Sequence, residues 1–99
     1  MERLNYNYVV GGTTEVGTYP PGANGLYDMA GNVVEWTNSQ YQSYPYNAAD
    51  GRENTDNGAS RSLRGGAWPD SGNSVRCAVR GRFDPDYGNY NVGFRVVAP

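Results

Sequence analysis

Histidine and lysine are both absent from this 99-residue sequence, and cysteine occurs once, at Cys77. Without histidine, nucleophilic schemes built on Ser-His-Asp or Cys-His arrangements are excluded. A single cysteine excludes an internal disulfide, and beside aliphatic residues it is typical of a small buried side chain. All eight basic residues are arginine, which suits bidentate ion pairs and stacking on rings. We therefore expect several of the arginines to be structural.

Long apolar runs are also lacking, since apolar residues make up 37% of the chain. The first ten residues are too polar for a signal peptide or a membrane span, which predicts no membrane insertion and a cytoplasmic location by default. A net charge of −2 without long runs of one sign disfavours nucleic acid and anionic membranes as partners. Low net charge and 13% aromatic residues argue against disorder. The length predicts one domain, residues 1–99.

Short alternating segments predict a fold made mainly of strands and loops. The expected strands are 4–10, 32–37, 61–64, 74–80 and 93–97. Val34 and Trp36 should point inward, because β-formers dominate their segment. Asn24 can cap a short helix that Gly31 would end.

Two further segments carry specific expectations. In 74–80, the side chains of Val75, Cys77 and Val79 alternate with those of their neighbours and should face the core. Residues 38–60 have no hydrophobic period and form a long loop, which by default is a solvated surface segment. The three tyrosines of that loop keep a contribution to binding open.

Residues 64–95 combine two kinds of composition. Glycine, arginine and an aromatic residue occur at both ends, where backbone turns, packing and ion pairs need them. Most of residues 68–91 are Asp, Ser, Gly, Asn, Tyr or Phe. Aromatic side chains supply rigid contact area and small polar ones supply adaptable hydrogen bonds, a composition typical of recognition surfaces. The segment is therefore predicted to be a ligand-binding face on a rigid scaffold.

Four ordered motifs carry a family resemblance. They are GLYDMAGNVVEWT (25–37), RSLRGGAW (61–68), VRCAVR (75–80) and GFRVV (93–97). Together they resemble the formylglycine-generating-enzyme, or sulfatase-modifying-factor, domain over about residues 13–97. The resemblance implies an α+β, C-type-lectin-like fold with a small twisted antiparallel sheet, one or two short helices and much irregular loop. The domain is usually longer in that family, so the chain resembles its C-terminal part or a minimal version.

The oxidases of this family activate copper with two cysteines placed just after the RGGSW-like motif. Here that place holds Pro69, Asp70 and Ser71. Because Cu(I) prefers soft thiolate pairs, a single cysteine cannot supply the site. A second branch, the sulfoxide synthases, uses iron held by histidines, which this chain lacks. The sequence therefore predicts a protein that is not an enzyme and requires no cofactor.

A third branch resembles the chain more closely, namely the variable proteins of diversity-generating retroelements. The resemblance implies a non-enzymatic display module whose surface, at about residues 68–91, is diversified through altered adenines in AAC codons. Such codons cannot encode Lys, Glu, Gln, Met or Trp, and none of these occurs between Pro69 and Asn91. Asn73, Asn89 and Asn91 would be unaltered positions. The alternative is a member or fragment of a formylglycine-generating-enzyme-type oxidase that has lost its copper-binding cysteines.

The contact surface is expected to bind a protein or another macromolecular ligand. Its predicted residues are Asp70, Ser71, Asn73, Val79, Gly81, Phe83, Asp84, Tyr87, Asn89 and Tyr90. The predicted frame residues are Arg64, Gly65, Gly66, Trp68, Arg76, Ala78, Arg80, Pro85, Gly93, Phe94 and Arg95. For the three aromatic contact residues, core or rim packing is the alternative, since aromatic side chains bury large areas wherever they can.

The resemblance also implies a calcium site. Its ligands would be the carboxylates of Asp28 and Glu35 and the carbonyls of Gly31 and Val33. Oxygen ligands of this kind suit Ca²⁺. The alternative is that Glu35 forms a buried ion pair with a scaffold arginine.

Overall fold

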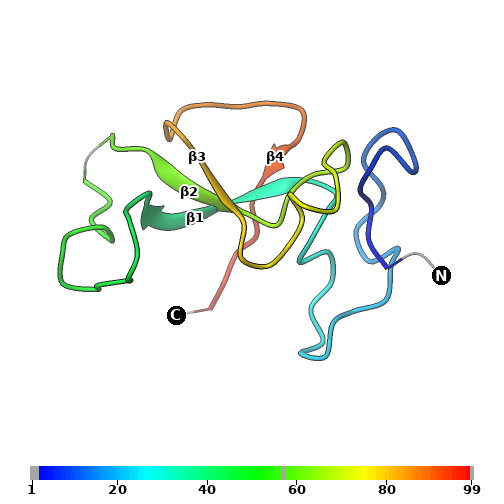
Figure 1. The fold of residues 1–99 in the computed structure, drawn as a ribbon, viewed down its shortest axis with the longest axis horizontal. Coiled ribbons are helices and arrows are strands. Elements are labelled where there is room, and N and C mark those ends of the chain that lie inside the picture. Colours follow the sequence, from blue (N-terminus) through cyan, green and yellow to red (C-terminus); the bar gives the residue numbers. More distant parts are fainter. Residues whose placement is uncertain (1–2, 57, 99) are drawn as a thin grey trace.

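A four-stranded sheet forms the centre of the computed structural model, which describes residues 3–56 and 58–98 (Figure 1). Its strands are β1 (Val34–Gln40), β2 (Arg61–Arg64), β3 (Arg80–Phe83) and β4 (Val92–Gly93). Their order is β3-β2-β1-β4, with antiparallel pairs except for β1 and β4, which are parallel. The sheet is therefore mixed, and the expected all-antiparallel sheet is wrong. The reason is that the chain crosses from one edge to the other before β4 begins.

Two predicted strands are present. β2 has the predicted bounds, and β1 starts at Val34 and continues to Gln40, beyond the predicted end. Trp36 lies opposite Leu63, which is 2% exposed, while Val34 and Trp36 are half-buried. Val34 and Leu63 line the same side of the sheet, which agrees with the inward orientation predicted for Val34.

The core is small and contains buried polar groups. Within the described residues, Leu63 and Ala67 are the buried hydrophobic side chains, and Asn5 and Asn32 are buried beside them. The Asn32 backbone N–H donates to the Asn5 backbone carbonyl (2.8 Å), and the Asn32 side-chain oxygen accepts from the Thr14 backbone N–H (2.9 Å). Buried amides are stable when such bonds satisfy them. Asn32 thereby joins the N-terminal segment to the start of the sheet.

The predicted helix after Asn24 is wrong, since no helix occurs in residues 3–56 or 58–98. Gly25 has φ +80° and Asp28 has φ +54°, whereas a right-handed helix needs φ near −63°. Turns form instead, with the Gly25 N–H donating to the Gly22 carbonyl (2.9 Å). Leu26, which lies within the predicted helix, is exposed. The described part of the chain accordingly holds no helix long and apolar enough to cross a membrane.

The strand predicted for 4–10 is also wrong. Asn7 and Tyr8 have φ of +53° and +58°, which is incompatible with an extended strand. Their N–H groups donate to the carbonyls of Asp70 (2.8 Å) and Trp68 (3.0 Å). This segment therefore packs against the loop that follows β2 and not against a sheet edge.

The strand predicted for 74–80 is a series of turns up to β3. The Ser74 N–H donates to the Ser71 carbonyl (3.0 Å), and the Val79 N–H donates to the Arg76 carbonyl (3.1 Å). The turns bring Val75 against Gly66, where an added Cβ would lie 2.6 Å from the valine Cγ1. Cys77 is exposed, so its predicted burial is wrong. Arg76 and Ala78, assigned to the frame, are exposed as well.

The remaining expectations concern the long loop and the last strand. Residues 38–40 belong to β1, and 41–56 and 58–60 form the described part of the predicted loop. Arg52 stabilises this loop through an ion pair with Asp50 (2.6 Å). The last strand is shorter than 93–97, since β4 ends at Gly93 and the following valines are exposed.

Candidate functional site

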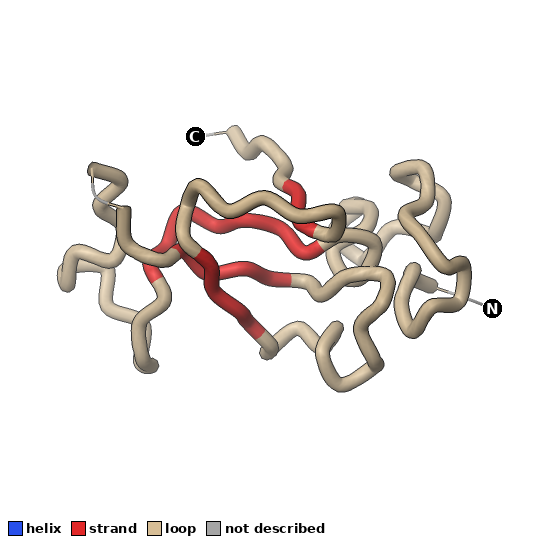
Figure 2. Tube along the Cα trace, turned by 90° about the horizontal axis from the view of Figure 1, so that it is seen from above, coloured by secondary structure: helices blue, strands red, loops and turns tan. Residues whose placement is uncertain are grey.

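Residues 84–91 cross from β3 at one edge of the sheet to β4 at the other, and we call them the crossover (Figures 1 and 2). The ribbon shows this segment as an arch above the strands. Its turns are held by backbone bonds from the Tyr87 N–H to the Asp84 carbonyl (3.0 Å) and from the Val92 N–H to the Asn89 carbonyl (3.3 Å). All its residues except Asn91 are exposed. The backbone is thus fixed by main-chain bonds while most side chains face solvent.

A hollow of about 280 Å³ lies between the crossover and the sheet, and we call it the crossover hollow. Val34 and Leu63 contribute to it from the two central strands, and Gly81 and Phe83 from β3. Arg80 of β3 also lines it, and the loop after β2 and the crossover complete its wall with Gly65, Gly66, Asp70, Ser74, Val79, Asn89 and Asn91. A concave site with an apolar base and polar groups on its wall is typical of a ligand site.

Five of the ten predicted contact residues line this hollow. They are Asp70, Val79, Gly81, Phe83 and Asn89. The other five are Ser71, Asn73, Asp84, Tyr87 and Tyr90, which are exposed around it or farther along the loops. None of the ten is sealed in the interior.

Phe83 and Tyr87 form an exposed aromatic pair beside the hollow. Their rings stack with centroids 4.1 Å apart and an interplanar angle of 16°. The Tyr87 hydroxyl accepts a hydrogen bond from the Asn89 side-chain amide (2.8 Å). The two side chains are 40% and 36% exposed, so the pair is a surface feature that retains contact area for a ligand.

A second aromatic group surrounds Trp68. The ring of Tyr90 lies 6.0 Å from Trp68, and that of Tyr8 lies 5.4 Å from it in an edge-to-face arrangement. Tyr8 and Tyr90 are 64% and 69% exposed. Sequence reasoning missed Tyr8, because its position depends on backbone bonds between distant segments. No local pattern around residues 4–10 indicates these backbone hydrogen bonds.

Two of the predicted acidic contact residues have structural partners. The Asp70 carboxylate accepts from the Ala67 N–H (2.8 Å), and its carbonyl accepts from Asn7. The Asp84 carboxylate accepts from the Ser60 hydroxyl (3.2 Å). Asp70 therefore shapes the turn that borders the hollow, in addition to facing it.

The four predicted calcium ligands line a different hollow of about 230 Å³, together with Arg95. Arg95 donates to both carboxylate oxygens of Glu35, one at 2.8 Å, and to the carbonyl of Asp28 at 2.9 Å. The Asp28 carboxylate accepts from the Gly17 N–H (2.9 Å). The bond to Glu35 raises the pKa of Arg95, which stays cationic.

This arrangement agrees with the alternative stated for Glu35 in its partner, a scaffold arginine, but the pair is partly exposed and not buried. Both carboxylate oxygens of Glu35 accept hydrogen bonds from the Arg95 guanidinium. In this arrangement the four predicted ligands therefore do not fit Ca²⁺. No cluster of three or more His, Cys, Asp or Glu side chains suited to a metal occurs in the described part of the chain.

A family model for the sulfatase-modifying factor enzyme 1-like domain matches residues 4–99. The chain belongs to this family. The curled mixed sheet and the motif order agree with the fold that the sequence resemblance implied. The Glu35–Arg95 pair therefore joins two motifs of a sulfatase-modifying-factor domain, from segments 60 residues apart.

Relatives of this domain have diverse names. The chain is 39% identical over 100 residues to a serine/threonine-protein kinase, pkn1, of Chlamydia pneumoniae, covering 96% of this chain and 16% of the kinase. It is 39% identical over 93 residues to inactive C-alpha-formylglycine-generating enzyme 2 of Bos taurus, covering 88% of this chain and 27% of that protein. The chain thus spans about a quarter or less of these curated relatives.

Among solved structures, the domain is similar to Treponema denticola variable protein 1. The TM-score is 0.76 at 30% identity, with 92% of this chain and 34% of that chain covered. Its name places it in the class of variable proteins that the sequence resembles.

Proposed function

We propose that this domain is a non-enzymatic ligand-binding module whose contact surface is formed by the crossover hollow and its aromatic side chains. The observation that carries the proposal is that Asp70, Val79, Gly81, Phe83 and Asn89 line one hollow. The stacked Phe83–Tyr87 pair extends that surface into solvent. Aromatic anchors beside a concave apolar base are typical of binding hot spots.

We further propose that this surface is diversified, as in the variable proteins of diversity-generating retroelements. The similarity to Treponema denticola variable protein 1 supports this. The exposure of the crossover side chains supports it as well, because side chains that carry little of the core can be exchanged at little cost in stability. The variable region is about residues 68–91, and the frame lies outside it or between its exposed positions.

The proposed ligand is a protein or another macromolecule, bound without chemistry. A surface of Asn, Asp, Gly and Tyr side chains matches the composition of protein-recognition loops. We propose neither nucleic acid nor insertion into a membrane as its target, since the chain has a net charge of −2.

The diversification proposal is tested in the genome that encodes the chain. We expect a reverse-transcriptase gene nearby and a near-copy of the coding segment for residues 68–91. Differences between the two copies should fall at adenines of the near-copy and change the exposed contact positions, such as Tyr87 and Tyr90. Differences spread over all four bases, or falling equally on Gly65 and Gly66, would refute it.

Binding is tested by display. A library that varies Tyr87, Asn89 and Tyr90 is selected against a folded target protein, with a matched library at exposed positions 47–49 of the long loop as the control. We expect binders from the first library that lose affinity when Phe83 is changed to Ala. Equal recovery from the control library would show that the crossover surface has no special capacity.

The alternative function is that of a formylglycine-generating-enzyme-type oxidase lacking its copper-binding cysteines. The similarity to a bovine relative named as inactive supports this reading. A Cu(I) titration with oxygen-consumption measurements separates the two proposals. Because the chain has one cysteine, tight Cu(I) binding with oxygen uptake would require copper ligands other than the usual cysteine pair, and it would favour a working oxidase. Ligand binding without copper binding or oxygen uptake would favour the display module.

A further inference from the structure

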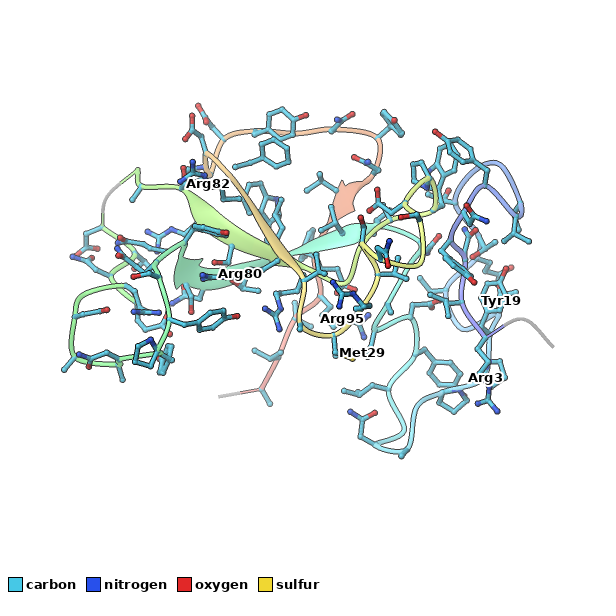
Figure 3. All side chains as sticks on the ribbon, viewed as in Figure 1. Arg3, Tyr19, Met29, Arg80, Arg82 and Arg95 are labelled. Carbon is cyan, nitrogen blue, oxygen red and sulfur yellow. The ribbon has the colours of Figure 1, made fainter. Side chains whose placement is uncertain are left out.

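The two faces of the β2–β3 pair differ in chemistry. Leu63 lies opposite Gly81 in the register and faces the crossover hollow. The alternate residues project to the other face, where Arg64 lies opposite Arg80 and Ser62 lies opposite Arg82. By this alternation three arginines start from the face opposite Leu63, and one of them, Arg80, also reaches the wall of the crossover hollow. Figure 3 shows Arg80 and Arg82 together, far from Arg3 at the other end of the molecule.

These three arginines have no carboxylate partner in the described residues, where the two ion pairs are Arg52–Asp50 and Arg95–Glu35. Arg64 donates to the Cys77 carbonyl (2.7 Å) and, more weakly, to the Tyr44 hydroxyl (3.4 Å). Because like charges directly opposite each other on a sheet repel, the Arg64–Arg80 pair is unfavourable without a counter-charge.

Arg80 is held in place by aromatic rings. Its guanidinium carbon lies 4.2 Å from the ring centroids of both Tyr41 and Tyr44, which come from the long loop. The guanidinium of Arg82 lies 5.3 Å from the Tyr41 ring. Cation–π contacts fix the position of a guanidinium while leaving its N–H groups, which lie in its plane, available to an acceptor.

A hollow of about 190 Å³ opens beside this cluster, and we call it the arginine hollow. Arg64 and Arg80 line it together with the hydroxyl-bearing side chains of Ser62, Thr37, Ser39, Tyr44 and Tyr46. No carboxylate lines it among the described residues. The nearby acids are engaged, since Asp50 binds Arg52 (2.6 Å) and Glu53 accepts from the Ser39 hydroxyl (2.7 Å).

We propose that the arginine hollow binds a tetrahedral oxyanion, that is, a phosphate or sulfate group. Arg64 and Arg80 approach it from neighbouring strands, with roughly 5 Å between their Cβ atoms. Each guanidinium can donate two parallel bonds, and a tetrahedral anion has enough oxygens to accept from both, whereas a carboxylate matches one. The bound anion neutralises the repulsion between the two arginines. The Ser62 hydroxyl is a further donor at the base.

This inference does not rest on the proposed display function, although Arg80 lines both the arginine hollow and the crossover hollow. A protein that binds phosphate there and shows no variable surface would satisfy this inference alone. The reverse result would satisfy the display proposal alone.

The test is a titration of the ¹⁵N-labelled chain with sodium phosphate, sodium sulfate or sodium acetate, followed by NMR at constant ionic strength. We expect phosphate and sulfate to shift signals of residues 37–46, 61–64 and 80–82, and acetate to bind at least about tenfold more weakly. R80Q should weaken phosphate binding by about tenfold or more, since charge-assisted bonds are the stronger class.

R82Q provides a second variant if R80Q fails to fold, with an expected weakening of about threefold from the lost neighbouring charge. R3Q is the matched control: it removes the same charge at the distant end of the molecule, and phosphate binding should not change. Equal binding of acetate and phosphate would overturn the proposal. So would shifts outside these segments, or equal effects of R80Q and R3Q.

Discussion

Gly31 offers a sharp test of the rigid frame, because Gly25 is a natural control for it. Both glycines have positive φ, +77° at Gly31 and +80° at Gly25. An added Cβ at Gly25 meets nothing within 4 Å, whereas one at Gly31 collides with the backbone carbonyl oxygen of Asn5. The two Gly→Ala changes therefore share the conformational penalty and differ only in the collision.

The expected magnitudes follow from this difference. Alanine in the left-handed region costs about 1 kcal/mol, which is the whole effect expected for G25A. G31A must also displace Asn5, whose carbonyl accepts from the Asn32 N–H (2.8 Å) and whose side chain donates to the Gly12 carbonyl (2.8 Å). Leaving buried polar groups unpaired costs about 1–3 kcal/mol each, so the total for G31A should reach about 3–4 kcal/mol.

Urea unfolding, followed by tryptophan fluorescence, measures both variants. We expect the free energy of unfolding to fall at least about 2 kcal/mol further for G31A than for G25A. Equal losses would show that the approach of Asn5 to Gly31 contributes nothing. The buried asparagine network would then not be the frame that the display proposal requires.

Three further predictions concern an exposed ring, an ion pair and the long loop. Tyr90→Ser should lower the free energy of unfolding by less than about 1 kcal/mol, because that side chain is 69% exposed, and a larger loss in urea would place it in the core. Glu35→Gln should lower the free energy of unfolding by about 1 kcal/mol, since it weakens a partly exposed ion pair. Millimolar Ca²⁺ should leave the Tm of the unmodified chain unchanged. A calcium-dependent rise in Tm that Glu35→Gln abolishes would restore the calcium prediction. The bond from Arg52 lowers the pKa of Asp50 below 3.8, and the bonds from Ser39 and Tyr46 lower that of Glu53 below 4.5. The unfolded chain therefore binds more protons than the folded one as the pH falls below about 5, so the loop should lose stability on acidification through that range. Amide exchange measures this stability as a function of pH, and Asp50→Asn should make that profile flatter.

The motifs predicted the family and the position of the main strands, because the residues of these motifs make contacts that the members of this fold share. The sequence suggested an ion pair between Glu35 and a scaffold arginine as the alternative to calcium, but it did not single out Arg95, which is the partner in the structure. β2 could be predicted because it places one apolar residue, Leu63, between polar neighbours, although Arg61 and Ser62 are buried along with it.

The misassigned elements fail for physical reasons. The pattern around Leu26 looks helical, but Asp28 adopts a left-handed conformation, as asparagine and aspartate do more readily than most residues. The alternation through Cys77 looks extended, but the turns there are fixed by the approach of Val75 to Gly66. The backbone conformation of such segments depends on contacts with residues distant in sequence, and a local sequence pattern does not contain that information. The same holds for Tyr8 beside Trp68.

The crossover has both of its ends built into the sheet, one in β3 and the other in β4, at opposite edges. Its span is therefore set by the width of the β2–β1 pair, and an inserted or deleted residue would shift Val92 away from its partner Val34. Under the proposed display function, lineages of this domain should therefore change specificity by exchanging residues at constant length, unlike antibody loops, whose lengths also vary.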